Sequence, residues 1–295
     1  MAAPAPLLAC ERLRSAALSG AAAAQDPAYI AVLHGVTGSS GQLAPFTQRL
    51  IDAAATAAGR PIEAILLNQR GHGASRDLPF PPPHSVDACT DDAVALLRHE
   101  LGTQAPLAIL GHSLGGKVWV IDAAAGETPT SSFALLLGML GRLAALQQPL
   151  DSLEPVKQAV ADAGLPEPAQ MYMASRCEQL GHGRCRTGFD PSLTRALLES
   201  YLVTDLSHLV SAPLPGVQLH FINGGDSDIL EGCPEEKERF TAGIAAKRAA
   251  GSTGPSTEAV QYWEVPGAGH FVPWTHAAEL AATVAPVLAS AVALA

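Results

Sequence analysis

The sequence predicts an α/β protein: a three-layer sandwich with a mostly parallel sheet, helices on both faces and a helical cap insertion. Short apolar runs alternate with helical patterns along most of the chain. This order is typical of βαβ units with right-handed crossovers. The alternation stops over residues 140–212, where helical patterns continue without a clear buried strand. That segment predicts a helical insertion between two parts of the sheet.

The first half of the chain alternates strand and helix. Four apolar runs have the length and composition of buried strands: 29–34, 62–67, 106–110 and 133–137. Three helical patterns lie between them, each followed by a glycine: 42–58, 86–101 and 114–125.

The alternation resumes after the insertion. Residues 217–223 and 260–265 predict strands, residues 234–250 a charged helix, and the chain from residue 277 a final helix. We therefore expect three parts: an N-terminal extension with the first strands (1–28), a core (29–139 and 213–295) and a helical cap (140–212).

The composition excludes several classes of protein. The chain has 295 residues, of which 48% are hydrophobic and 16% charged, and this balance excludes an intrinsically disordered chain. The formal net charge is −10. An acidic surface repels phosphate backbones, so we expect no nucleic-acid partner.

The five cysteines and the termini indicate an intracellular protein. The cysteines are odd in number and contain no C-x-x-C pair, which favours a reduced compartment, and their spacing matches no zinc template. Residues 1–20 contain no uninterrupted apolar run of a signal peptide. The apolar stretch 280–295 is too short for a membrane span and predicts a terminal helix with a buried face. We expect a cytoplasmic location, no metal and no integral membrane contact, and leave organellar import open.

Residues 111–115 read Gly-His-Ser-Leu-Gly, a G-x-S-x-G pattern. The pattern alone is weak, but here it follows the predicted strand 106–110 and opens a helical pattern, which is the context of a nucleophile elbow. The glycines are needed because a turn this sharp leaves no room for a Cβ beside the strand. The turn presents Ser113 at the carboxyl edge of the sheet, where open α/β sheets bind ligands. Ser113 is therefore the candidate nucleophile.

A glycine-rich loop, residues 34–40, follows the first predicted strand. It lacks the motifs of a phosphate-binding loop, so we expect it to direct a backbone N–H at the same point as the elbow. The amides of Val36 and Leu114 are the candidate donors of an oxyanion hole. We expect His34, Gly35 and His112 to contact the substrate.

The candidate base is His270, on the glycine-framed loop that follows the last predicted strand. It would take the proton of Ser113 and return it to the leaving group. A carboxylate must orient this histidine, and two aspartates after the strand 217–223 compete. Asp228 lies far enough along the loop to turn back toward the histidine, whereas Asp226 is suited to brace the turn. We favour Asp228 and keep Asp226 as the second choice.

Four motifs in this order resemble the α/β-hydrolase superfamily, from about residue 29 to the end of the chain: His34-Gly35, Arg70-Gly71-His72-Gly73-Ala74-Ser75, Gly111-His112-Ser113-Leu114-Gly115-Gly116-Lys117 and Gly269-His270. The extension of the elbow and the segment 267–272 resemble the esterase group around α/β-hydrolase-domain-containing protein eleven and its plant and algal relatives.

The resemblance implies a sandwich with a helical cap, Ser113 as nucleophile, His270 as base and an acid after the penultimate strand, with no cofactor or metal. In some members of the esterase group the acid instead follows the strand after the elbow helix. The corresponding place, taken as residues 137–140, contains no carboxylate. This departure favours Asp228.

The sequence supports three functional hypotheses. The first is a serine hydrolase that cleaves small-molecule carboxylic esters or thioesters through an acyl-enzyme. The second is a small-molecule receptor or binding protein with negligible turnover on the same fold. The third is an acyltransferase or a hydrolase of C–C bonds, because the triad chemistry is shared. Apolar residues of the cap, Met171 among them, predict an acyl pocket. The oligomeric state stays open.

Overall fold

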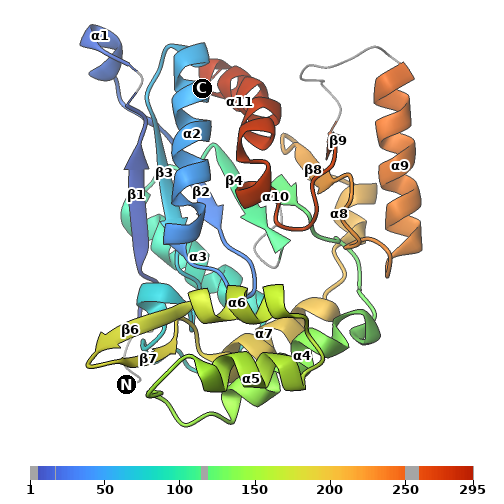
Figure 1. The fold of residues 1–295 in the computed structure, drawn as a ribbon. Coiled ribbons are helices and arrows are strands. Elements are labelled where there is room, and N and C mark those ends of the chain that lie inside the picture. The colour runs from blue at the N-terminus through green and yellow to red at the C-terminus, as the bar shows by residue number, and fades with distance from the viewer. Residues whose placement is uncertain (1–5, 17, 114–118, 250–258, 295) are drawn as a thin grey trace.

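The computed structural model describes residues 6–16, 18–113, 119–249 and 259–294 (Figure 1). Its centre is a sheet of order β1-β3-β2-β4-β5-β8-β9, in which β1 is antiparallel to β3 and the other pairs are parallel. The strands are β1 (Cys10–Arg14), β2 (Ala28–Leu33), β3 (Ile62–Leu67), β4 (Ala108–His112), β5 (Trp119–Ile121), β8 (Leu219–Gly224) and β9 (Val260–Val265).

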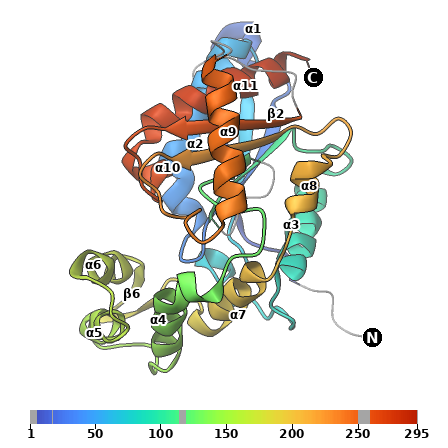
Figure 2. The same ribbon diagram turned by 90° about the vertical axis from the view of Figure 1, so that its right-hand side faces the viewer.

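Helices cover both faces of this sheet (Figure 2). On one face α2 (Ser40–Ala58) and α11 (Ala277–Leu294) pack against each other and against apolar side chains of the central strands, such as Ile30 and Leu66. The other face is covered by α3 (Val86–Leu101), α8 (Ser207–Ser211) and α9 (Pro234–Ala249). The α/β three-layer sandwich with a mostly parallel sheet is therefore confirmed.

The insertion forms a layer of its own beside the sheet (Figures 1 and 2). It consists of α4 (Ala134–Ala144), α5 (Glu154–Asp162), α6 (Glu167–Ser175), β6 (Cys177–Gly181), β7 (Arg184–Thr187) and α7 (Pro191–Leu202). These elements share a separate apolar core that includes Leu140, Val156 and Leu197. Two short helices complete the chain: α1 (Gly20–Ala23) and α10 (Val272–Thr275).

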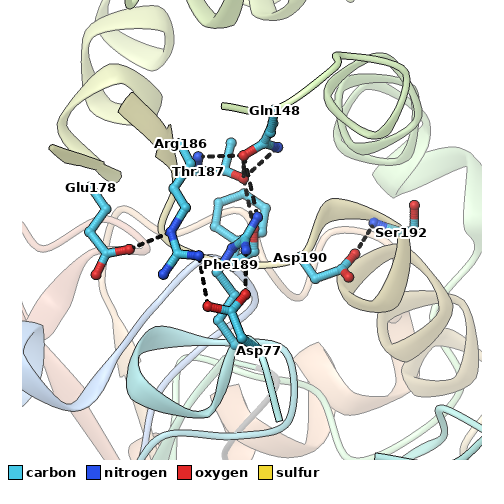
Figure 3. A network of polar contacts seen from close by, with 9 residues as sticks. Asp77, Gln148, Glu178, Arg186, Thr187, Phe189, Asp190 and Ser192 are labelled. Carbon is cyan, nitrogen blue, oxygen red and sulfur yellow. Dashed lines mark hydrogen bonds and ion pairs between the residues drawn. The ribbon is translucent and has the colours of Figure 1, made fainter. Parts of the chain in front are cut away.

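Polar contacts tie the β6–β7 hairpin of the insertion to the core (Figure 3). Arg186 donates to Glu178 of the same hairpin and to Asp77 of the loop after β3, each over 2.7 Å. The amide of Thr187 donates to the Gln148 side chain over 2.9 Å. Phe189, which follows the hairpin, forms an isolated bridge with His72 and is fully buried.

Two predicted elements are wrong. Residues 133–137, predicted as a strand, mostly belong to α4, and a short apolar run cannot distinguish a buried strand from a buried helix. The predicted helix 114–125 contains β5, a three-residue strand that is too short to show a period of its own.

The hairpin β6–β7 within the insertion was not expected, because its mostly exposed side chains carry no apolar run. The predicted boundaries between core and cap, at residues 139/140 and 212/213, stay a prediction. Helix α4 runs across the first of these boundaries.

The connection between β4 and β5 is unusually short. The two strands are parallel neighbours, with Leu110 opposite Trp119. Parallel strands ordinarily need a crossover of a dozen or more residues. Only residues 113–118 separate the last residue of β4 from the first of β5. The first part of the helix predicted over 114–125 lies outside the described residues, and β5 occupies part of the rest.

Candidate active site

Ser113 directly follows β4 at the carboxyl edge of the sheet. Its backbone is in the left-handed region, with φ 54°, a strained conformation for a residue other than glycine. Gly35 packs so closely that a Cβ there would lie 3.1 Å from the Cβ of Ser113 and 3.1 Å from Nδ1 of His112. Glycine at residue 35 therefore lets the loop after β2 approach the serine closely, because a larger residue would push against Ser113 and His112.

His270 comes from the loop after β9, and its Nδ1 lies 2.7 Å from Oδ2 of Asp122. Asp122 is the residue that follows β5 and, like Ser113, has a left-handed backbone, with φ 53°. Because neighbouring parallel strands end at the same edge of the sheet, β4 and β5 bring Ser113 and Asp122 to that edge.

The choice of carboxylate made from the sequence is corrected by this contact. Within the described residues, neither Asp228 nor Asp226 forms a hydrogen bond or an ion pair with His270, and Asp122 takes that position. The alternative place for the acid was expected after residues 133–137, which are not a strand. The detectable signal was the apolar run 118–121 that ends in an aspartate.

Asp122 is fully buried and held by three donors. Besides the histidine, the Ser227 hydroxyl donates to Oδ2 over 2.6 Å and the Gly224 amide donates to Oδ1 over 2.9 Å. Burial raises the pKa of this carboxyl, but the hydrogen bond and field of His270, with the bonds from Ser227 and Gly224, outweigh burial and lower the pKa. Asp122 is therefore an anion that can orient an imidazole and stabilise its protonated form.

Ser113 and His270 line one cavity, yet no hydrogen bond joins them in the described chain. Such contacts are often long in ligand-free structures and tighten when a substrate is bound. Since Nδ1 of His270 faces Asp122, its other ring nitrogen is available for the serine hydroxyl.

His112 supports the loop that carries the base. Burial, and next the field of His270, lower the pKa of His112 to about 3, so its ring is neutral. Nε2 of His112 donates to the carbonyl oxygen of His270 over 2.8 Å. Nδ1 is then an acceptor, and it is buried without a partner among the described residues. His112 also lines the cavity, and its contact with a substrate stays a prediction.

The loop after β2 supplies one candidate oxyanion donor. Val36 lines the cavity, and its amide has no hydrogen-bond partner in the described residues. Its carbonyl oxygen is held 2.6 Å from Nε2 of His72, which fixes the peptide at that point. Leu114, the other predicted donor, lies outside the described residues.

Two residues predicted to contact the substrate lie elsewhere. His34 is fully buried behind the loop, where Nδ1 donates to the Gly35 carbonyl and Nε2 accepts from the Gln69 amide. Met171 of α6 is not among the residues that line the cavity and is 54% exposed, whereas its neighbours Tyr172 and Met173 line the cavity. Gly35 lines the cavity, and its contact with a substrate stays a prediction.

The cavity has a volume of about 620 Å³. Its walls come from the loop after β2, the insertion helices α4, α6 and α7, the loop between β8 and α9, and the segment around α10. Most of the lining side chains are apolar or aromatic, for example Leu136, Met139 and Phe271. This lining suits an apolar group of the ligand next to the serine.

A metal centre and a membrane-spanning helix are two other kinds of functional feature. No group of three or more His, Cys, Asp or Glu side chains in the described part of the chain is arranged to hold a metal ion. Among the described helices, α11 is long and apolar enough by composition to cross a membrane, and here it packs on α2 and the sheet with side chains such as Leu280 and Val284 buried.

Solved structures with the same fold include esterases and a thioesterase. A marine microorganism esterase shares 16% identity over 94% of this chain and 98% of its own, with a TM-score of 0.65. A structure from a study of carboxylesterases of the thaumarchaeon Nitrososphaera gargenis shares 14% identity over 99% of this chain and 98% of its own, with a TM-score of 0.58. The thioesterase domain of the curacin biosynthetic pathway shares 17% identity over 94% and 99%, with a TM-score of 0.52.

At these identities the structural likeness shows the fold alone, and no curated protein sequence matches the chain. The finer resemblance to the group around α/β-hydrolase-domain-containing protein eleven therefore stays a prediction. A family model, by contrast, matches residues 30–283, which is most of the chain and includes every residue of the site described above. The chain belongs to the alpha/beta hydrolase family.

Proposed function

We propose that the protein is a serine hydrolase that cleaves carboxylic esters or thioesters through an acyl-enzyme. The observation that carries the proposal is the hydrogen bond of 2.7 Å between His270 and the buried anion Asp122, in a cavity that Ser113 also lines. An imidazole oriented in this way by a carboxylate is the arrangement that activates a serine.

The proposed reaction has two halves. Ser113 Oγ bonds to the acyl carbon while His270 takes the hydroxyl proton, and Asp122 stabilises the imidazolium that forms. The Val36 amide would donate to the developing oxyanion. The bond to the leaving oxygen or sulfur then breaks, and His270 returns the proton to the leaving group. Water repeats the sequence on the acyl-enzyme and releases the acid and Ser113.

The proposal is tested by Ser113→Ala. We expect kcat for 4-nitrophenyl butyrate to fall by about 10⁶-fold, because removal of a triad serine abolishes the acyl-enzyme. A burst of nitrophenol in the unaltered protein, and its loss in the variant, would identify the covalent step. Hydrolysis at the original rate by the variant would contradict the assignment.

The second candidate, a receptor with very slow turnover, is favoured by one observation. The Ser113 hydroxyl and the His270 imidazole are not hydrogen-bonded in the described structure. A kcat below about 10⁻² s⁻¹ across a panel of esters and thioesters, against about 10 s⁻¹ for a typical enzyme, would support this candidate instead.

A further inference from the structure

Apart from histidines and tyrosines, the ionisable acid and base side chains that line the active-site cavity are both carboxylates. They are Asp228 and Glu231, and no lysine or arginine is among the described lining residues. Both belong to the loop between β8 and α9, residues 225–233. The ligand therefore meets an apolar wall from the insertion on one side and a negatively charged loop on the other.

Asp228 is the less compensated of the two carboxylates. Its side chain is exposed and has no ion-pair partner in the described chain. Glu231 forms an ion pair with Lys237 of α9, which offsets part of its charge. The first turn of α9 also carries two acidic residues, Glu235 and Glu236, beside Lys237.

The cation nearest the opposite wall belongs to a different hollow. Arg176 lies over the ring of Tyr172, with Cζ 5.2 Å from the ring centroid. Together with Glu178 it lines a neighbouring hollow of about 260 Å³. This hollow shares Thr37 and Gly38 with the cavity, but its guanidinium group is not part of the cavity wall.

Two further features favour a positive ligand. Asp122 is a buried anion directly behind His270. Aromatic rings form part of the wall beside it: Phe271 lies 5.2 Å from Tyr172 and 5.9 Å from Trp274 between ring centroids. The faces of such rings attract cations, quaternary ammonium groups in particular.

We propose that this cavity selects esters that carry a cationic group, accepts neutral esters, and discriminates against anionic substrates such as phosphate-bearing thioesters. The inference rests on the proposed function and narrows its substrate class. Exposed charges attract each other weakly in water, so we expect a preference of about 3- to 20-fold in kcat/KM rather than an absolute requirement.

The test uses two pairs of esters that match in shape and differ in charge. In the first pair, cationic butyrylcholine and neutral 3,3-dimethylbutyl butyrate, the difference in charge lies in the alcohol group. The 4-nitrophenyl esters of 4-(trimethylammonio)butyrate and 5,5-dimethylhexanoate place it in the acyl group, and 4-nitrophenyl monoadipate supplies the anion. We expect the cationic member to be preferred in at least one pair at 10 mM NaCl, and the adipate to be the poorest nitrophenyl substrate.

Variants and salt identify the cause of the preference. Asp228→Asn with Glu231→Gln should reduce it to within about twofold, and 0.5 M NaCl should do the same by screening. Asp226→Asn is the matched control, because it removes one charge from the same loop at a residue outside the cavity lining. It should leave the ratio of kcat/KM between the cationic and the neutral ester unchanged.

The outcomes separate this inference from the proposed function. Absence of hydrolysis of all of these esters would contradict the proposed hydrolase. In that case calorimetric binding of the same pairs to Ser113→Ala protein still measures the charge preference. Hydrolysis of the neutral esters without a cation preference in either pair, or a preference that survives the double substitution, would overturn the charge selectivity alone.

Discussion

At the scale of single residues, the orientation of His270, the candidate base, depends on Asp122. The sequence offered two aspartates on the loop after β8, but the contact of 2.7 Å to His270 comes from the residue after β5. The same carboxylate accepts from Ser227 and from the amide of Gly224, so the loop after β8 contributes donors to the acid rather than the acid itself.

Substitution of this carboxylate tests the correction. Asp122→Asn should lower kcat for 4-nitrophenyl butyrate by about 10⁴-fold, because the amide favours the wrong tautomer of the histidine. Asp226→Asn, which removes a nearby carboxylate without a contact to His270, should lower it by less than about threefold. Steady-state kinetics with both variants checks this, and a reversed order would restore the acid to the loop after β8.

Two buried neutral histidines make stability depend on pH. Burial, and next the field of a neighbouring histidine, lower the pKa of His34 and of His112 to about 3. In the unfolded chain both titrate near 6.5, so the unfolded state binds more protons below that pH. Their contribution is complete above pH 6.5 and falls as the pH drops toward 3, by about 2 kcal/mol each at pH 5.

Urea unfolding at pH 7.5 and pH 5 measures this loss. His34→Gln should lower the stability at pH 7.5 yet reduce the difference between the two pH values. His99→Asn, at a residue whose side chain is 62% exposed, should leave the difference unchanged. Equal differences in all three proteins would show that the buried ring of His34 does not cause the effect.

At the scale of elements, packing rather than ion pairing holds the insertion to the core. Arg186 bridges Glu178 and Asp77, but all three side chains are partly exposed. Phe189 is 1% exposed and stacks on His72, with ring centroids 5.9 Å apart. His72 in turn holds the carbonyl of Val36, so Phe189 links the insertion to the loop that would stabilise the oxyanion.

The buried ring of Phe189 and the exposed ion pairs of Arg186 should contribute unequally to the free energy of unfolding. Phe189→Ala should reduce the free energy of unfolding by about 3–5 kcal/mol, because a buried aromatic ring is replaced by a cavity. Arg186→Ala should reduce it by about 1 kcal/mol or less, because exposed ion pairs contribute little. Chemical denaturation compares the two, and a larger loss for Arg186→Ala would assign the attachment to electrostatics.

Elements of ordinary length could be predicted from the sequence, and short ones could not. Strands β2, β3 and β9 and helices α2 and α3 lie where apolar runs and helical spacing predicted them. Strand β5 has three residues and was absorbed into a predicted helix. The acid was missed for the same reason, since Asp122 is recognisable only once the strand before it is known.

At the scale of the whole molecule, the order of the strands assembles the site from distant parts of the chain. Strands β4, β5 and β8 are neighbours in the sheet, and their carboxyl ends bring Ser113, Asp122 and the loop after β8 together. The sequence motifs placed Ser113 and His270 at this edge, because each residue follows a strand that can be recognised from its apolar run. The shape of the cavity could not be predicted, since its walls depend on how the insertion packs over the edge.

Because the connection between β4 and β5 is short, two members of the candidate triad lie close together in the sequence and the third lies far away. Ser113 and Asp122 belong to one stretch of the chain, whereas His270 comes from a loop 148 residues beyond the aspartate and is followed by α10 and α11. In the proposed hydrolase, a cut in the chain between Asp122 and His270 would place the base on a different fragment from the other two groups. Activity would then depend on whether the two fragments stay packed together.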